Sequence, residues 1–270
     1  MKKARTWFKP LARAGYGGRG LVYLFAGIFA VIAGFSGSQE AGSREVIDWL
    51  LNQPFGRTIL FALTVCLAGY VAWRLVQSLL DADEHGFDVK GLVIRAGLFV
   101  SAMTYTILAI YTLSRLGVFS SDSGGGGGGG VADYIAGFIG AHYVSLVLAI
   151  CFAGVGVAHV YKAATRRYND HIQAPSEAQW LVDGSAMAGL GARGLIFFVL
   201  AVMSFYRFLS ADGGSGDPPG LKDALGFIEG LPAGSILMAV MGLGLVAFAV
   251  YSFVESRYRR IDVEQASLPG

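Results

Sequence analysis

The sequence is short of charged residues, cysteines and prolines for a chain of 270 residues. Charged side chains account for 15% of it, whereas hydrophobic side chains account for 54% and the mean hydropathy is +0.55. A water-soluble domain of this length does not need so much apolar content, so we do not expect a soluble globular protein. The formal net charge of only +2 gives no reason to expect a nucleic-acid partner.

Groups that catalyse reactions or hold metals are also scarce. The only two cysteines, Cys66 and Cys151, fall in apolar runs, so neither a disulfide framework nor a zinc-binding spacing is present. The sequence has no paired carboxylates, no nucleophile beside a base and no H-E-x-x-H motif. We therefore predict that the protein is not an enzyme and that it has no metal and no cofactor.

Six apolar segments are long enough to cross a membrane. About 20 apolar residues in a helix span the roughly 30 Å of hydrocarbon in a bilayer. The runs are continuous rather than alternating, which predicts helices and not a barrel. The first and the fifth reach this length only together with the small residues before them. The predicted spans are 21–35, 58–80, 92–113, 144–164, 195–209 and 235–254.

A short stretch around an arginine occurs three times. Each copy has a glycine four residues before the arginine and an aromatic residue four residues after it, and each opens a long apolar run. The arginines are Arg19, Arg95 and Arg193. This recurrence predicts structural repeats. We place them at residues 10–83, 84–172 and 180–262 of a single membrane domain, 1–270.

The second half of each repeat aligns without gaps from an aspartate. These are Asp48, Asp133 and Asp223, which we expect to cap or solvate short interfacial helices. In this register one later position is always glycine, which predicts close helix packing at Gly69, Gly154 and Gly244. The middle repeat is longer because of seven consecutive glycines at 124–130, which we expect to form a flexible loop.

The same register leaves two weaker alternatives for metal binding. Cys66, Cys151 and Met241 share one position and would form a soft ligand set suited to Cu(I), although packing explains these side chains more simply. His142 or His159 is the kind of residue that binds a haem iron. The two lie 17 residues apart on one predicted helix, so they cannot bind the same iron.

The basic residues predict the orientation of the chain. Most of the 21 Lys and Arg fall on one side when the N-terminus is placed inside, whereas the acidic residues divide almost evenly. Because short cytoplasmic loops are enriched in Lys and Arg, both termini are predicted to be cytoplasmic. The basic N-terminus also resembles a signal peptide, but the recurrence of the same helix at Arg95 and Arg193 favours a retained helix.

The glycine-rich stretches 15–20 and 189–194 match the pattern G-x-G-x-x-G. Dinucleotide binding needs a strand before this pattern and a soluble helix after it, and here a membrane helix follows instead. The glycines are expected to let helices approach closely.

The three repeated arginines have two interpretations. One is anchoring at the inner surface, to lipid phosphate or to the carbonyl end of a neighbouring helix. The other is convergence of Arg19, Arg95 and Arg193 on one anion or lipid headgroup.

Several motifs resemble a bacterial family. They are Arg19-Gly20-Leu21-Val22-Tyr23, the turn Gln53-Pro54-Phe55-Gly56-Arg57, and Gly69-Tyr70 with Trp73-Arg74. The family is that of domain of unknown function 1206, whose members carry three copies of a two-helix membrane unit. The resemblance covers nearly the whole chain and is weakest in the middle copy. It implies a multi-pass protein of the bacterial plasma (inner) membrane, and it brings no catalytic residues.

These features together predict an all-α integral membrane protein. Its six transmembrane helices would form three repeated hairpins in a pseudo-threefold bundle, with both termini cytoplasmic. We expect an accessory protein that binds membrane lipids or another membrane protein. The alternative is a small pseudo-threefold carrier or anion-binding transporter, which is weakened because the spans lack charged residues at the middle of the membrane.

Overall fold

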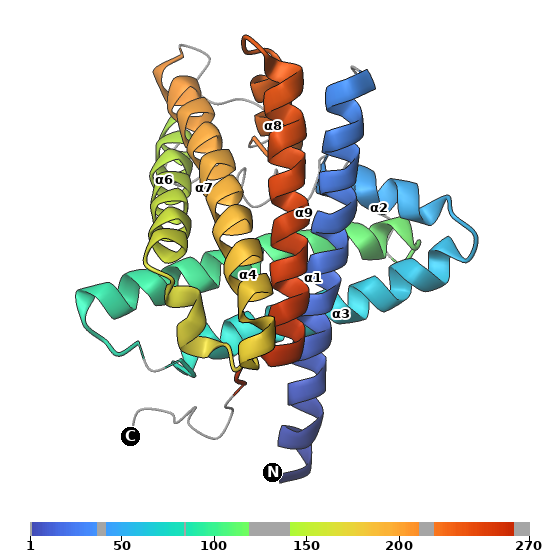
Figure 1. The fold of residues 1–270 in the computed structure, drawn as a ribbon, viewed down its shortest axis with the longest axis vertical. Coiled ribbons are helices and arrows are strands. Elements are labelled where there is room, and N and C mark those ends of the chain that lie inside the picture. Colours follow the sequence, from blue (N-terminus) through green and yellow to red (C-terminus); the bar gives the residue numbers. More distant parts are fainter. Residues whose placement is uncertain (1, 37–41, 84, 119–140, 211–218, 262–270) are drawn as a thin grey trace.

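The computed structural model describes residues 2–36, 42–83, 85–118, 141–210 and 219–261 (Figure 1). Over these residues the chain is helical, and its β-structure is limited to an isolated bridge between Ile172 and Arg259. The predicted glycine loop at 124–130 and Asp133 lie outside the described residues. The long helices are α1 (Lys2–Ser36), α3 (Gly56–Leu79), α4 (Val89–Arg115), α6 (Ala141–Ala164), α7 (Gln179–Leu209) and α9 (Gly234–Tyr258). The shorter elements are α2 (Ser43–Leu51), α8 (Leu221–Glu229) and two 3₁₀ turns, Arg167–His171 and Ser176–Ala178.

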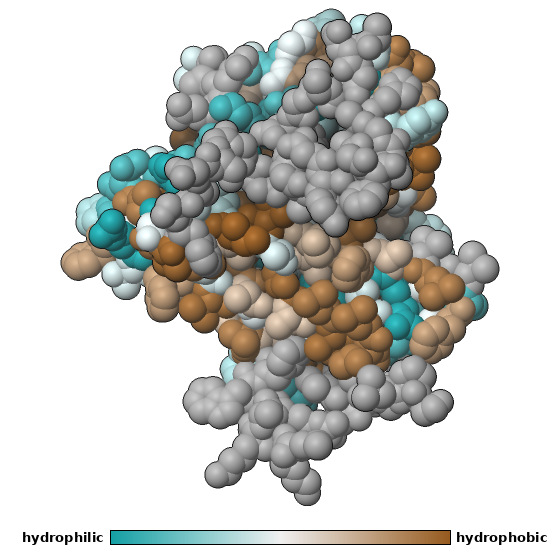
Figure 2. All heavy atoms as spheres, turned by 180° about the vertical axis from the view of Figure 1, so that it is seen from behind, coloured by the Kyte–Doolittle hydropathy of each residue, from teal (hydrophilic) through white to brown (hydrophobic). Residues whose placement is uncertain are grey.

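The six long helices are each long and apolar enough to cross a membrane, with candidate spans of 22 to 34 residues. Exposed apolar side chains are accordingly common, and Figure 2 shows them covering the middle of the face seen from behind. The all-α architecture and the six membrane-length helices that the sequence predicts are confirmed.

Helices α1 and α7 begin well before the apolar runs that predict them. The runs start at residues 21 and 195, whereas the helices start at Lys2 and Gln179. The G-x-G-x-x-G stretches are therefore helical and not phosphate-binding loops. The arginine within each of these two stretches lies inside a long helix rather than at its entrance.

Glycines allow the helices to meet at backbone distance. A Cβ atom at Gly27 of α1 would lie 2.7 Å from the carbonyl oxygen of Gly242 on α9. A Cβ atom at Gly156 of α6 would lie 3.2 Å from the carbonyl oxygen of Gly194 on α7. Inside a membrane no hydrophobic driving force joins the helices, so the close packing that small residues allow stabilises their contact. The glycines therefore hold α1 to α9 and α6 to α7.

The long helices pack in the order of an open ring. Helix α1 packs on α3 and α9, α7 packs on α9 and α6, and α4 packs on α3, but no comparable packing joins α4 to α6 over the described residues. Figure 1 shows α6, α7, α9 and α1 side by side in one layer, which α3 and α4 cross at a steep angle. The predicted pseudo-threefold bundle is therefore not confirmed. In the middle repeat, no described atom lies within 4 Å of a Cβ at Gly97 of α4 or Gly154 of α6, so these two glycines do not make the close helix contacts seen in the other repeats.

The short helices α2 and α8 are equivalent, and they fix the register between the first and third repeats. Each follows a glycine, Gly42 or Gly220, and each leads into a turn of the form Pro-X-Gly. The middle residue of that turn, Phe55 or Ala233, has a φ of 60° in both. The buried positions also correspond. They are Val46, Ile47 and Leu50 in α2, and Ala224, Leu225 and Ile228 in α8.

This register corrects the alignment on aspartates by nearly one helical turn. Counted from the helix start, Asp223 corresponds to Glu45 and not to Asp48. Gly244 then corresponds to Cys66, and the packing agrees. Gly18 of α1 lies against Cys66, and Gly244 lies against Ala192, which is the counterpart of Gly18 on α7. Cys66, Cys151 and Met241 consequently do not share one repeat position, and no group of three His, Cys, Asp or Glu side chains within the described chain is placed to hold a metal.

Candidate functional site

Arg19 is enclosed in the protein, with only 2% of its surface exposed. Its guanidinium group donates to the hydroxyl of Tyr70 on α3 at 2.7 Å and to Ser252 Oγ on α9 at 3.0 and 3.2 Å. It also forms an ion pair with Glu255 on α9. The rings of Tyr70 and Phe248 lie 5.0 and 4.9 Å from its central carbon. All three nitrogens thus have acceptors, and Arg19 ties α1 to α3 and α9.

The ion pair of Arg19 continues into a buried network at the end of α9. Glu255 accepts a second hydrogen bond from Arg259 at 2.7 Å, and Arg259 also donates to Asp83 at 3.1 Å. Asp83 accepts from Gln77 of α3 at 2.5 Å. The charged side chains of these pairs are no more than 8% exposed. The network links α1, the end of α9 and the segment after α3.

Three groups around this network lie outside the membrane spans. Burial raises the pKa of Asp83, but the charge of Arg259 outweighs this effect and the pKa lies below its ordinary value. Burial lowers the pKa of Arg259, but nearby Tyr16 and Asp83 hold it well above its ordinary value. Burial and the charge of Arg259 both lower the pKa of His171. At neutral pH, Asp83 and Arg259 are therefore charged and His171 is neutral.

Arg95 lies apart from this network and caps α3. Its guanidinium group donates to the carbonyl oxygens of Ser78 at 2.7 Å and Leu79 at 3.0 Å, in the last turn of that helix. The ring of Phe87 covers it at 4.5 Å. Bonding to the carbonyl end of a neighbouring helix is one of the two anchoring roles expected from the sequence.

Arg193 has aromatic neighbours but no acceptor. The rings of Tyr23, Phe197 and Phe248 lie 4.8, 5.2 and 4.4 Å from its central carbon. Its Nε atom is buried without a hydrogen-bond partner, and the side chain as a whole is half-buried. Within the described residues, Arg193 thus has cation–π contacts and no anionic partner.

The described contacts bring two of the three arginines together. Arg19 and Arg193 both contact the ring of Phe248, whereas Arg95 bonds elsewhere, and no group contacts all three. The glycines assigned to helix packing differ in the same way. Gly69 lies against Leu11 of α1 and Gly244 against Ala192 of α7, whereas nothing lies within 4 Å of a Cβ at Gly154.

Helix α9 lies beside Arg19 in the same way that α6 lies beside Arg193, so positions on α9 and α6 can be compared. Each arginine is followed by a glycine. Gly20 lies against Phe253 of α9, and Gly194 lies against Val160 of α6. The residues just before these two, Ser252 and His159, make matching hydrogen bonds to the carbonyl oxygen one turn earlier, both at 2.8 Å.

Glu255 lies two residues after Phe253 on α9, and Lys162 lies two residues after Val160 on α6. Where Arg19 faces a carboxylate on its neighbouring helix, Arg193 therefore has a lysine at the equivalent position. Lys162 makes no hydrogen bond or ion pair within the described part of the chain and is half-buried. The two equivalent positions thus carry opposite charges.

The sequence predicted the arginines but missed their partners. Ser252 and Glu255 lie on α9, which the alignment on aspartates places nearly one turn out of register. Asp83 follows α3, outside the repeated positions, so no pattern marks it. The two Pro-X-Gly turns, at Pro54 and Pro232, were the available signal, since a turn with a left-handed residue tolerates no shift in register.

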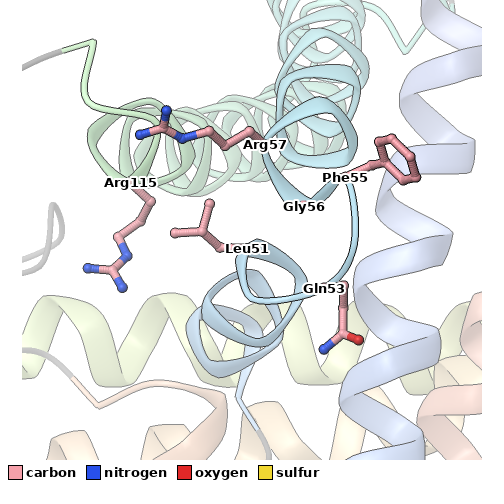
Figure 3. Close-up of a pocket in the computed structure, with 6 residues that line it drawn as sticks. All are labelled: Leu51, Gln53, Phe55, Gly56, Arg57 and Arg115. Atoms are coloured by element: carbon pink, nitrogen blue, oxygen red, sulfur yellow. The ribbon is translucent and has the colours of Figure 1, made fainter.

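A pocket of about 430 Å³ lies at the turn between α2 and α3 (Figure 3). Its lining residues are Leu51, Gln53, Phe55, Gly56, Arg57 and Arg115. Arg115 is already paired with Asp48 at 2.7 Å, and both side chains are well exposed. Ion pairs this exposed contribute little, and the pocket includes no residue of the arginine network.

Comparison with known proteins agrees with the fold. The chain is 24% identical over 272 aligned positions to the uncharacterised protein YxxB of Bacillus subtilis (strain 168). The alignment covers 98% of this chain and 96% of that protein. No solved structure matches. The family profile described as Domain of Unknown Function (DUF1206) matches residues 14–81 and 188–259, which are the helical hairpins α1–α3 and α7–α9 and just over half of the chain. The chain belongs to this Domain of Unknown Function (DUF1206) family.

Proposed function

We propose that the protein is a lipid-binding accessory protein of the bacterial plasma membrane, with both termini in the cytoplasm, and that it neither catalyses a reaction nor binds nucleic acid. The observation that carries this proposal is the enclosure of Arg19. Each of its three nitrogens already bonds to the protein itself and its charge is paired with Glu255, so it is poorly placed to bind a transported solute. Arg193, by contrast, is half-buried and has no acceptor within the part of the chain that the structure describes, which suits a molecule that arrives from the membrane.

A carrier would need a different centre. Alternating access requires a path that opens to each side around a central site. Between α1 and α9 the backbones touch at Gly27 and Gly242, and the side chains around Arg19 are buried. We therefore favour a lipid-binding protein, which acts alone or with another membrane protein, over a carrier.

Two measurements test this proposal together. Native mass spectrometry of the protein, extracted from its own membranes in mild detergent, is expected to show bound phospholipid. Proteoliposomes that contain the protein are expected to take up radiolabelled phosphate no faster than empty liposomes. Loss of all lipid on extraction, combined with protein-dependent uptake, would establish the carrier instead.

The proposed orientation has its own test. Fusions are made after residue 260, one to green fluorescent protein and one to alkaline phosphatase. Because both termini are expected to be cytoplasmic, the first fusion should fluoresce and the second should be inactive in a bacterial host. An active phosphatase fusion would reverse the orientation.

A further inference from the structure

We infer that a phosphate-bearing lipid headgroup binds at the edge of the contact between α6 and α7, against Arg193 and Lys162. This inference rests on the proposed lipid-binding function and gives that function a site, a ligand class and a test of its own.

The first observation is the charge difference between two equivalent positions. Arg19 is neutralised by Glu255 on the neighbouring helix α9, whereas the counterpart of Glu255 on α6 is Lys162. Arg193 and Lys162 both lie within electrostatic reach of His159 on α6, and Glu255 of α9 lies within reach of Lys162. An anion from outside the protein would take the place of the carboxylate.

The second observation is that a hydrogen-bond donor of Arg193 has no acceptor among the described residues. This donor is the buried Nε atom, and leaving a buried donor unpaired is costly. Three aromatic rings fix the guanidinium plane. A phosphate oxygen suits such a donor, since arginine binds phosphate with short, charge-assisted hydrogen bonds.

The third observation concerns His159, which lies near both cations. Its ring is 5.4 Å from that of Phe197, and its Nδ1 atom bonds to the carbonyl oxygen of Val155 at 2.8 Å. A carbonyl only accepts, so Nδ1 is the donor and Nε2 of the neutral ring carries a lone pair. That lone pair is suited to a hydroxyl group of the ligand. A phosphodiester with a hydroxylated headgroup meets both requirements.

The surroundings favour a lipid over a free anion. Helices α6 and α7 form the outer edge of the helical layer in Figure 1. Val157 and Val160 of α6 and Leu195 of α7, all close to the site in sequence, are 58%, 39% and 51% exposed. Because residues two apart point to opposite sides of a helix, these side chains offer acyl chains an apolar surface on the outer face of α6 and α7, around the helices from the cations.

The test uses the purified full-length protein, stripped of lipid in detergent and titrated with phosphatidylglycerol or with phosphatidylcholine of the same chains. Native mass spectrometry is expected to show about tenfold or greater preference for phosphatidylglycerol. Lys162→Gln and Arg193→Gln should each weaken its binding about tenfold, the scale of a lost hydrogen bond to a charged group. Arg257→Gln, which removes an exposed cation from α9, should change nothing.

A second variant replaces the proposed lipid phosphate with a carboxylate of the protein itself. Lys162→Glu places a carboxylate where Arg19 has Glu255, so it should abolish phosphatidylglycerol binding while the protein stays folded. A separate arm compares sodium phosphate with sodium chloride at equal ionic strength. Stabilisation of the wild type by phosphate alone, lost in Lys162→Glu, would assign the site to a free phosphate and not to a lipid.

The outcomes separate this inference from the proposed function. If folded Lys162→Gln and Arg193→Gln retain phosphatidylglycerol like the wild type, the site is wrong and lipid binds elsewhere on the protein. If the wild type itself binds neither lipid nor phosphate, the proposed lipid-binding function fails as well.

Discussion

At the scale of single residues, one repeated arginine serves three different purposes. Arg19 is paired with Glu255 inside the protein, Arg95 caps a helix end, and Arg193 lies among aromatic rings with no acceptor among the described residues. The difference comes from the residues that face each arginine and not from the arginine itself. A repeat that is recognised by its arginine therefore predicts where three cations lie, but not what each one binds.

The buried network predicts a large effect of Glu255→Gln. The substitution leaves Arg19 and Arg259 buried without their shared carboxylate, and breaking a buried ion pair in this way destabilises by about 3–5 kcal/mol. Glu45→Gln is the matched control, because Glu45 pairs with Lys222 at a partly exposed position, where such pairs contribute about 0–1 kcal/mol. Unfolding in mixed micelles measures both. Equal losses of stability would show that the network is not tightly coupled.

The same region predicts a loss of stability in acid. The pKa of His171 is lowered from 6.5 in the folded protein, so the unfolded chain binds this proton first and the free energy of unfolding falls as the pH drops below about 6.5. The lowered pKa of Asp83 adds a further loss in the range below its ordinary value of 3.8. Thermal unfolding between pH 7 and pH 5 should show the first loss, by up to about 1.4 kcal/mol per pH unit. His171→Gln should flatten this dependence, and an unchanged slope would assign it to another group.

At the scale of helices, apolar runs predicted which segments cross the membrane but not where the helices begin. Runs of hydrophobic residues report contact with lipid. The residues just before these runs pack on other helices instead, Gly15 of α1 against Tyr70 of α3 and Gly189 of α7 against Phe248 of α9, which composition does not reveal. The register between repeats was missed for a related reason. A single aspartate tolerates a shift by one turn, while the strained turns at Phe55 and Ala233 do not.

The glycine contacts give a prediction at this scale. Gly27→Ala places a Cβ atom 2.7 Å from the carbonyl oxygen of Gly242 and forces α1 away from α9. Overpacking of this kind destabilises by about 1–3 kcal/mol. Gly97→Ala in α4 is the control, since nothing lies within 4 Å of its Cβ and alanine favours a helix by about 0.5–1 kcal/mol. Melting temperatures in detergent should move in opposite directions, and a fall in both would argue against the close contact of α1 with α9.

At the scale of the whole molecule, the helix count and the all-α class were predictable because they follow from length and hydropathy alone. The arrangement of the helices was not, because the repeat implies three equal hairpins, whereas over the described residues α4 does not pack on α6 as the helices of the other hairpins pack on each other. The functional proposal rests on the same inequality. Each repeat supplies an arginine, but the protein supplies the opposing carboxylate at Arg19 and a lysine at Arg193.

The most direct test of the account is a crystal structure of the protein grown from a lipid mesophase doped with phosphatidylglycerol. We predict phosphate density within hydrogen-bonding distance of Arg193 Nε and Lys162 Nζ, with Arg19 still paired to Glu255. A water-filled cavity that exposes Arg19, Arg95 and Arg193 to one another, with no lipid between α6 and α7, would contradict it.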